Sequence, residues 1–120
     1  MNKTTLVLGA SANPSRYSYL AMQRLRNHKH PVYAIGKRNG TVSDVMIETE
    51  KKNFENIHTI TLYLNQDHQK EYYEYILSLK PQRIIYNPGA ENPELSSLAA
   101  DHNIQNIEAC TLVMLSTGQY

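Results

Sequence analysis

Residues 5–18 have the sequence TLVLGASANPSRYS. The apolar run at 5–8 predicts a short buried β-strand that ends at a glycine. The residues that follow at helical spacing on one face are Ser18, Ala21, Met22 and Leu25. They predict a helix from Tyr17 to about Asn27. A second strand is predicted at 31–35, again ending at a glycine, so the chain begins with a strand–helix–strand unit.

The rest of the chain continues this alternation. Further strands are predicted at 57–62, 83–86 and 105–109, and further helices at 67–79 and from Asn92 onward. The sequence of residues 37–55 predicts mostly loop with a short strand at 45–47. The apolar run at 112–115 predicts a terminal strand or turn. We therefore expect an α/β fold: a three-layer, Rossmann-like, doubly wound sheet, mainly parallel, of about five strands. Ligands of such folds bind beyond the carboxyl ends of the strands.

Length and composition define the class of protein. The chain has 120 residues, of which 41% are hydrophobic and 19% charged, which predicts one globular domain over residues 1–120 and excludes a disordered chain. No apolar run approaches the roughly 20 residues that span a bilayer. The single cysteine, Cys110, cannot form an internal disulfide or a cysteine-based metal site by itself. We expect a cytoplasmic protein without a membrane segment.

The charges are unevenly distributed along the chain. Twelve basic and eleven acidic residues give a net charge of +1, which argues against a nucleic-acid or membrane partner. Residues 1–43, however, contain seven basic residues and no acidic ones, leaving five basic and eleven acidic residues in the remainder. The basic segment favours a phosphorylated ligand, and the alternative is a solvated face that assists solubility.

The loop after the first strand has the features of a phosphate-binding loop. Gly9 permits close approach of the backbone, Ala10 and Ser11 are small, and the loop leads into a helix N-terminus that favours an anion. The loop contains neither G-x-G-x-x-G nor G-x-x-x-x-G-K-[ST], which argues against ordinary dinucleotide or ATP-hydrolysis sites. The alternative is a strand-to-helix turn that uses small residues and proline for its geometry alone.

The loop after the second strand begins Gly36-Lys37-Arg38. An NAD-binding unit needs a carboxylate here for the ribose hydroxyls, so the two cations favour a phosphate on the ribose instead. They could equally be exposed loop cations. Leu64 and Asn65 follow the third strand, where a polar amide could meet a ligand, although amides are common in turns.

The sequence resembles a known family at several points. Five residues match the motif G-x-S-x-x-P-x-R-x-S: Gly9, Ser11, Pro14, Arg16 and Ser18. Residues 86–92 and 108–110 are similar to two looser family segments. The chain thus resembles the small stand-alone CoA-binding proteins and the N-terminal nucleotide-binding domain of the succinyl-CoA synthetase alpha chain. It departs from the family at Gly36-Lys37, where Asn-Pro is usual, and at Ile85 and Asn87, which replace Trp and Gln.

The resemblance implies a non-catalytic module that binds CoA or an acyl-CoA. The expected ligand-binding residues are Gly9, Ala10, Ser11, Pro14, Arg16, Ser18, Gly36, Lys37, Arg38, Leu64, Asn65, Asn87 and Gly89. Two other classes remain open: a small NAD(P)-dependent oxidoreductase, and a Rossmann-like scaffold for a protein partner. A homo-oligomer is also compatible with the sequence.

Catalytic and metal-binding patterns are weak. The five histidines lack metal-ligand spacing, Ser11 lies in no G-x-S-x-G elbow, and Glu91 is the only carboxylate in the loops after the four strands 5–8, 31–35, 57–62 and 83–86. We therefore expect neither a catalytic site nor a metal site.

Overall fold

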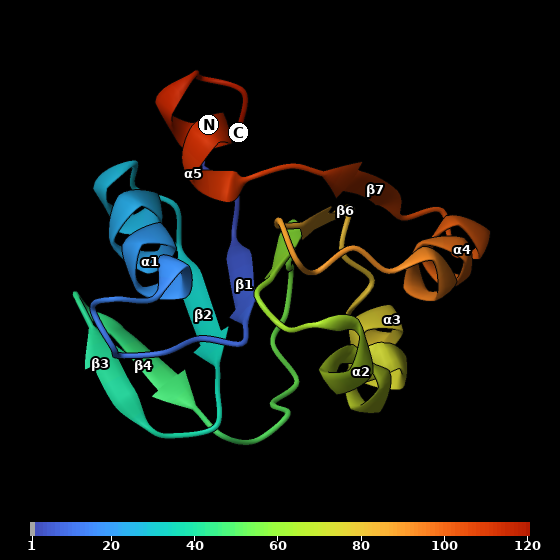
Figure 1. Ribbon diagram of the computed structural model, residues 1–120, viewed down its shortest axis with the longest axis horizontal. Helices are drawn as coiled ribbons and strands as arrows, with labels where there is room; N and C mark the ends of the chain where they lie inside the picture. Colours follow the sequence, from blue (N-terminus) through green and yellow to red (C-terminus); the bar gives the residue numbers. More distant parts are fainter. Residues whose placement is uncertain (1) are drawn as a thin grey trace.

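The computed structural model describes residues 2–120 (Figure 1). The strands are β1 (Thr5–Leu8), β2 (Val32–Ile35), β3 (Gly40–Val42), β4 (Val45–Glu48), β5 (Thr59–Leu62), β6 (Arg83–Tyr86) and β7 (Gln105–Glu108). The helices are α1 (Tyr17–Asn27), α2 (Gln66–Gln69), the 3-10 turn η1 (Lys70–Tyr72), α3 (Tyr73–Leu79), α4 (Pro93–Asp101) and α5 (Thr111–Ser116). Within this range, every helix is too short or too polar to cross a membrane.

One sheet contains all seven strands in the order β3-β4-β2-β1-β5-β6-β7. The expectation of about five strands was therefore too low. All neighbouring strands are parallel except β3 and β4, which form an antiparallel hairpin in the segment that we expected to be mostly loop. The chain builds outward from β1 through β2 and then returns to place β5 on the other side of β1. The topological switch point lies between β1 and β5, where a ligand is expected.

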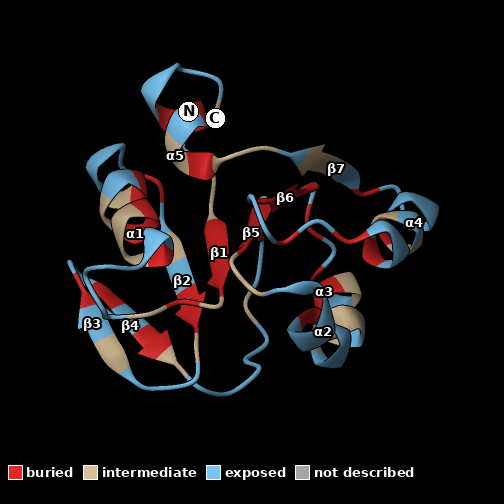
Figure 2. Ribbon diagram, in the orientation of Figure 1, coloured by how far each residue is buried: buried red, intermediate tan, exposed pale blue. Residues whose placement is uncertain are grey.

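Two helical layers enclose the sheet (Figure 1). Helices α1 and α5 cover one face, where Val7, Met22 and Leu25 belong to one buried cluster. Helices α3 and α4 cover the other face, where the second cluster includes Leu62 and Ile76. Figure 2 shows β1, β5 and β6 as the most buried part of the molecule. This confirms the expected three-layer α/β architecture.

Two helices differ from the sequence-based expectation. Residues 112–115 belong to helix α5 and not to a strand or turn. The predicted helix at 67–79 is divided into α2, η1 and α3. The predicted start of α4 is confirmed, because the side chain of Asn92 accepts a hydrogen bond from the Leu95 N–H (3.1 Å) and Pro93 is the first helical residue.

The hairpin leaves part of the sheet without a covering helix. On the face opposite α1, Tyr33 of β2 and Met46 of β4 are 40% and 68% exposed. Phe54, from the segment that follows β4, stacks on Tyr33 with ring centroids 4.2 Å apart. The Phe54 ring therefore covers this face of the sheet only in part, whereas a packed helix would bury the strands completely.

Candidate functional site

The loops that follow β1, β2 and β5 are in direct contact at the carboxyl edge of the sheet. The N–H groups of Gly9 and Ala10 both donate to the carbonyl oxygen of Ile35 (3.0 and 2.9 Å). A Cβ added to Gly36 would lie 2.1 Å from the carbonyl oxygen of Ala10, and one added to Gly9 would lie 2.9 Å from the carbonyl carbon of Tyr63. Gly9 also has φ +87°, which favours glycine. The two glycines allow the loops to pack against one another.

Hydrogen bonds within the loop after β1 give it a defined shape. The buried Ser18 hydroxyl accepts from the Ser11 N–H (3.1 Å), and the Ser11 hydroxyl accepts from the Asn13 N–H (3.1 Å). The predicted residues Ser11 and Ser18 are thus brought together, and each supports the loop backbone. Pro14 is exposed on the same loop.

Three N–H groups of this loop and the first turn of α1 are not used in internal hydrogen bonds. Those of Ala12, Tyr17 and Ser18 have no hydrogen-bond partner among residues 2–120. Tyr17 and Ser18 begin α1, where the helix dipole concentrates partial positive charge, and no side chain caps this end. The sequence motif did not single out Ala12 or Tyr17, because it identifies side chains whereas these donors belong to the backbone.

Cations lie beside these N–H groups. Arg16, Lys37 and Arg38 are exposed and make no ion pair within the described chain, whereas Arg26 is paired with Asp44 (2.8 Å). The charge of Glu48, which ends β4 beside β2, is paired with Lys52, and Asp67 lies in the first turn of α2 on the other side of the edge. The carboxyl edge is therefore positive over β1 and β2 and more acidic toward β5 and β6.

Asn87, another predicted ligand residue, makes its side-chain hydrogen bonds inside the protein. Asn87 is buried: its Nδ2 donates to the Thr61 hydroxyl (2.7 Å) and the Leu62 carbonyl oxygen (2.9 Å), and its Oδ1 accepts from the Thr111 N–H (2.8 Å). Both amide hydrogens are used inside the protein, so Asn87 links β5, β6 and α5 and does not present a donor to a ligand.

Asn65, Leu64 and Gly89 lie on the β5 and β6 side of the edge. Asn65 caps α2 by accepting from the His68 N–H (3.0 Å), and Leu64 is half-buried. Gly89 is exposed with φ +93°, and its N–H donates to the Glu91 carboxylate (2.9 Å). The basic side chains thus follow β1 and β2, whereas the loops after β5 and β6 contribute Leu64, Asn65 and the carboxylate of Glu91.

Comparisons with known proteins identify the family to which this chain belongs. Residues 3–116 match the family model described as the CoA binding domain. The chain belongs to this family. The CoA-binding domain thus covers nearly the whole sequence, which supports a CoA-binding role. The comparison with curated proteins gives no match.

Solved structures share the fold of this CoA-binding domain. One, titled an uncharacterized protein, is 44% identical over 100% of this chain and 99% of its own, with a TM-score of 0.97. A hypothetical protein from Pyrococcus horikoshii is 19% identical over 97% of this chain and 83% of its own (TM-score 0.87). A Thermus thermophilus protein is 17% identical over 99% of this chain and 91% of its own (TM-score 0.85). The last two show likeness of fold alone.

Tyr63 is a residue of the site that the sequence did not predict as important. Its hydroxyl is buried without a hydrogen-bond partner in the described structure, although the hydroxyls of Thr61 and Thr111, bonded to each other at 2.8 Å, lie nearby. Burial raises the pKa of this hydroxyl. Tyr63 therefore stays neutral at the switch point, and its backbone contact with Gly9 joins the loops after β1 and β5.

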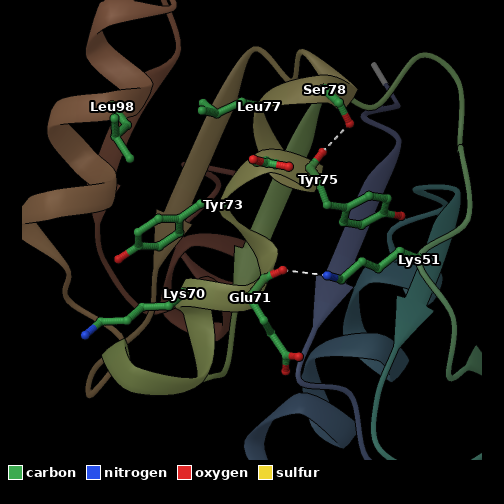
Figure 3. Close-up of a pocket in the computed structure, with 9 residues that line it drawn as sticks. Lys51, Lys70, Glu71, Tyr73, Tyr75, Leu77, Ser78 and Leu98 are labelled. Carbon is green, nitrogen blue, oxygen red and sulfur yellow. Dashed lines mark hydrogen bonds between the residues drawn. The ribbon is translucent and has the colours of Figure 1, made fainter.

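One hollow in the CoA-binding domain lies away from the carboxyl edge of the sheet. A depression of about 770 Å³ runs over α3 between Lys51 and Leu98 of α4 (Figure 3). The Lys51 amine donates to the carbonyl oxygen of Glu71 at its margin (2.5 Å). It contains none of the thirteen predicted ligand residues. The hollow is therefore separate from the loops at the carboxyl edge that carry the predicted residues.

Proposed function

We propose that this protein binds CoA or an acyl-CoA as a non-catalytic module. The observation that carries the proposal is the group of three unpartnered N–H groups, from Ala12, Tyr17 and Ser18, at the start of α1. Backbone donors at a helix N-terminus suit a diphosphate because they add directed hydrogen bonds to the positive end of the helix dipole. Arg16, next to them and exposed, adds a formal charge.

Lys37 and Arg38 recognise the second phosphate of the ligand in this proposal. They follow β2, where an NAD-binding unit would hold the ribose with a carboxylate. CoA carries a 3′-phosphate on its ribose, which two cations complement and a carboxylate would repel. The contact between Gly36 and Ala10 keeps these cations close to the diphosphate donors.

The non-catalytic part of the proposal rests on the residues of the same loops. Glu91 is the only carboxylate in the loops after β1, β2, β5 and β6, and its Oε1 accepts from the Gly89 N–H (2.9 Å). The described loops thus offer no acid–base pair. The half-buried, uncharged side chain of Leu64 suits the pantetheine arm.

The test compares CoA with dephospho-CoA by isothermal titration calorimetry. Replacing Lys37 and Arg38 with alanine should weaken CoA about 10- to 150-fold, because a charge-assisted hydrogen bond contributes about 1.5–3 kcal/mol. Dephospho-CoA should be much less affected. The matched control replaces Lys51 and Lys52, two other adjacent exposed cations, with alanine and should leave both affinities unchanged.

Three outcomes would contradict the proposal. Equal losses for CoA and dephospho-CoA would show that the cations attract ligands only through a diffuse field, and this loss would fade with added salt. Tighter binding of NADP than of CoA would favour the oxidoreductase class. Failure of every nucleotide to bind to the folded protein would favour a scaffold.

A further inference from the structure

Tyr120 lies at the amino edge of the sheet, at the opposite end of the strands from the candidate site. Its hydroxyl is 2.5 Å from the hydroxyl oxygen of Thr5, the first residue of β1, and the C mark in Figure 1 lies beyond this end of β1. The Thr5 hydroxyl donates its proton to the carbonyl oxygen of Lys3 (3.0 Å), so the Tyr120 hydroxyl donates in the bond between them. The guanidinium of Arg83 donates to the carbonyl oxygen of Tyr120 (3.3 Å). Hydrogen bonds therefore tie Tyr120 to β1 and β6.

His30 is in contact with both Tyr120 and Lys3. Its imidazole ring is 5.0 Å from the Tyr120 ring, centroid to centroid, and its Nδ1 accepts from the Lys3 N–H (2.9 Å). His30 is only 7% exposed, so these contacts are made away from water. Because Nδ1 accepts a hydrogen bond, it carries no proton and the imidazole is neutral. One neutral side chain thus holds segments from both ends of the described chain.

The groups that face this imidazole disfavour a positive charge on it. Burial is the largest cause that lowers the pKa of His30, and basic side chains from three segments act in the same direction: Lys3 before β1, His28 after α1 and Arg83 of β6. Arg26 of α1 donates to the His30 carbonyl oxygen (2.9 Å), and its own charge is paired with Asp44. Among residues 2–120, no carboxylate forms an ion pair with His30. A proton on this ring would therefore have no counter-charge.

We propose that His30 is the centre of an acid-sensitive clasp: protonation of its imidazole releases residues 117–120 and the segment before β1 from the amino edge of the sheet. The added proton goes to Nδ1, which then faces the Lys3 N–H, so a hydrogen bond becomes a contact between two donors. The imidazolium is also a second cation against the Tyr120 ring, since the Arg83 guanidinium carbon already lies 4.5 Å from the centroid of that ring. The proposal does not depend on CoA binding.

Release of Tyr120 uncovers apolar surface on the face that α1 and α5 cover. The Tyr120 ring packs against the buried cluster that contains Val7, Met22 and Leu115. Leu115 belongs to α5, so the clasp also fixes the end of this helix. The released imidazole takes up its proton near its ordinary pKa of about 6.5, whereas the clasped imidazole resists it. Release is therefore favoured as the pH falls below about 6.5.

Amide hydrogen exchange, measured by NMR one pH unit above and one below the ordinary imidazole pKa of about 6.5, tests the clasp. The Lys3 amide reports its bond to Nδ1, and the Gln119 amide, which donates to the Met114 carbonyl oxygen (2.8 Å), reports the segment after α5. The Tyr63 amide, bonded to the Leu8 carbonyl oxygen (2.9 Å), reports global unfolding. The Lys3 and Gln119 protection factors should lie below that of Tyr63 at both pH values and should fall about three- to tenfold at the lower one.

Three variants separate the clasp from a general effect of acid. His30→Gln keeps an acceptor for the Lys3 N–H but takes up no proton, so the fall in the Lys3 and Gln119 protection factors should disappear. His102→Gln, the matched control at an exposed histidine after α4, should retain it. Tyr120→Phe loses the hydroxyl donor and should lower the Gln119 protection factor at both pH values. Protection of Lys3 and Gln119 equal to that of Tyr63, no fall at the lower pH, or the same fall in His30→Gln would each overturn the proposal.

Discussion

Replacing Gly36 with alanine tests how closely the loops after β1 and β2 approach. The added Cβ would lie 2.1 Å from the carbonyl oxygen of Ala10. Because non-bonded heavy atoms are most stable about 3.5 Å apart, the two loops must separate by about 1 Å or more. Gly36 has no left-handed φ, so the effect is steric. Overpacking of this kind destabilises a fold by about 1–3 kcal/mol.

Urea unfolding and calorimetry measure the two consequences of Gly36→Ala. The free energy of unfolding should fall by about 1–3 kcal/mol and the melting temperature by about 4–12 °C. The affinity for CoA should fall about tenfold, since Lys37 and Arg38 move away from the start of α1.

The control for this experiment is Gly118→Ala. Gly118 has open space around it but φ +74°, so alanine there adds backbone strain of about 1–2 kcal/mol and should leave CoA affinity unchanged. If the Gly36→Ala variant is as stable as the wild type and binds CoA equally well, the inference that the two loops are in close contact at Gly36 is wrong.

Three further changes probe other parts of the structure. Ser18→Ala should lower the free energy of unfolding by about 1–3 kcal/mol and weaken CoA several-fold in calorimetry, because the Ser11 N–H loses its partner. Asn87→Ala should destabilise the fold by roughly 3 kcal/mol or more in urea unfolding, because it leaves the partners in β5 and α5 unsatisfied. Burial, with nearby cations, lowers the pKa of His30 and of His58 in the folded protein. As the pH falls, these two imidazoles are therefore protonated in the unfolded chain before they are protonated in the folded chain. The free energy of unfolding should therefore decrease as pH falls below about 6.5, and a His30→Gln, His58→Gln double variant should flatten this dependence.

The parts of the fold that local patterns determine were predictable. Apolar runs identified β1, β5 and β6, and the cap and proline at Asn92-Pro93 identified the start of α4. The predicted short strand at 45–47 is confirmed as β4, but its partner β3 was missed because β3 is only three residues long, and because the turn uses Ser43 at φ +55° where glycine would have been a signal. Strand β3 pairs antiparallel with β4, and β4 pairs in turn with β2. No local sequence pattern reveals these pairings.

Helix α5 was missed for a related reason. The run Leu112–Leu115 is short and apolar, which is also typical of a strand. Its N-cap residue, Cys110, makes no side-chain capping bond, and the Thr111 N–H is satisfied by Asn87, 24 residues earlier in the chain. A helix whose first turn is stabilised by a distant amide has no local start signal.

The positions of the candidate side chains at strand ends were predictable from the sequence, whereas the unpartnered backbone N–H groups were not. Lys37 and Arg38 follow β2 as the sequence indicated, and both are exposed at the carboxyl edge. The hydrogen bonds that use the N–H groups of Gly9, Ala10 and Ser11 internally could not be anticipated, since they depend on Ile35 and Ser18 in the folded chain. The available donors are consequently displaced along the loop to Ala12 and the first turn of α1.

The uneven charge of the carboxyl edge has a consequence for the encounter with a ligand. The molecule is almost neutral overall, at +1, yet the β1 and β2 half of this edge is basic while Asp67 and Glu91 lie toward β5 and β6. Such a surface exerts a torque as well as an attraction on an elongated molecule whose phosphates are all at one end. In the proposed complex, this torque would turn the nucleotide end toward β2 and the uncharged arm toward β6 before contact, so the direction of the ligand across the sheet would be set during diffusion.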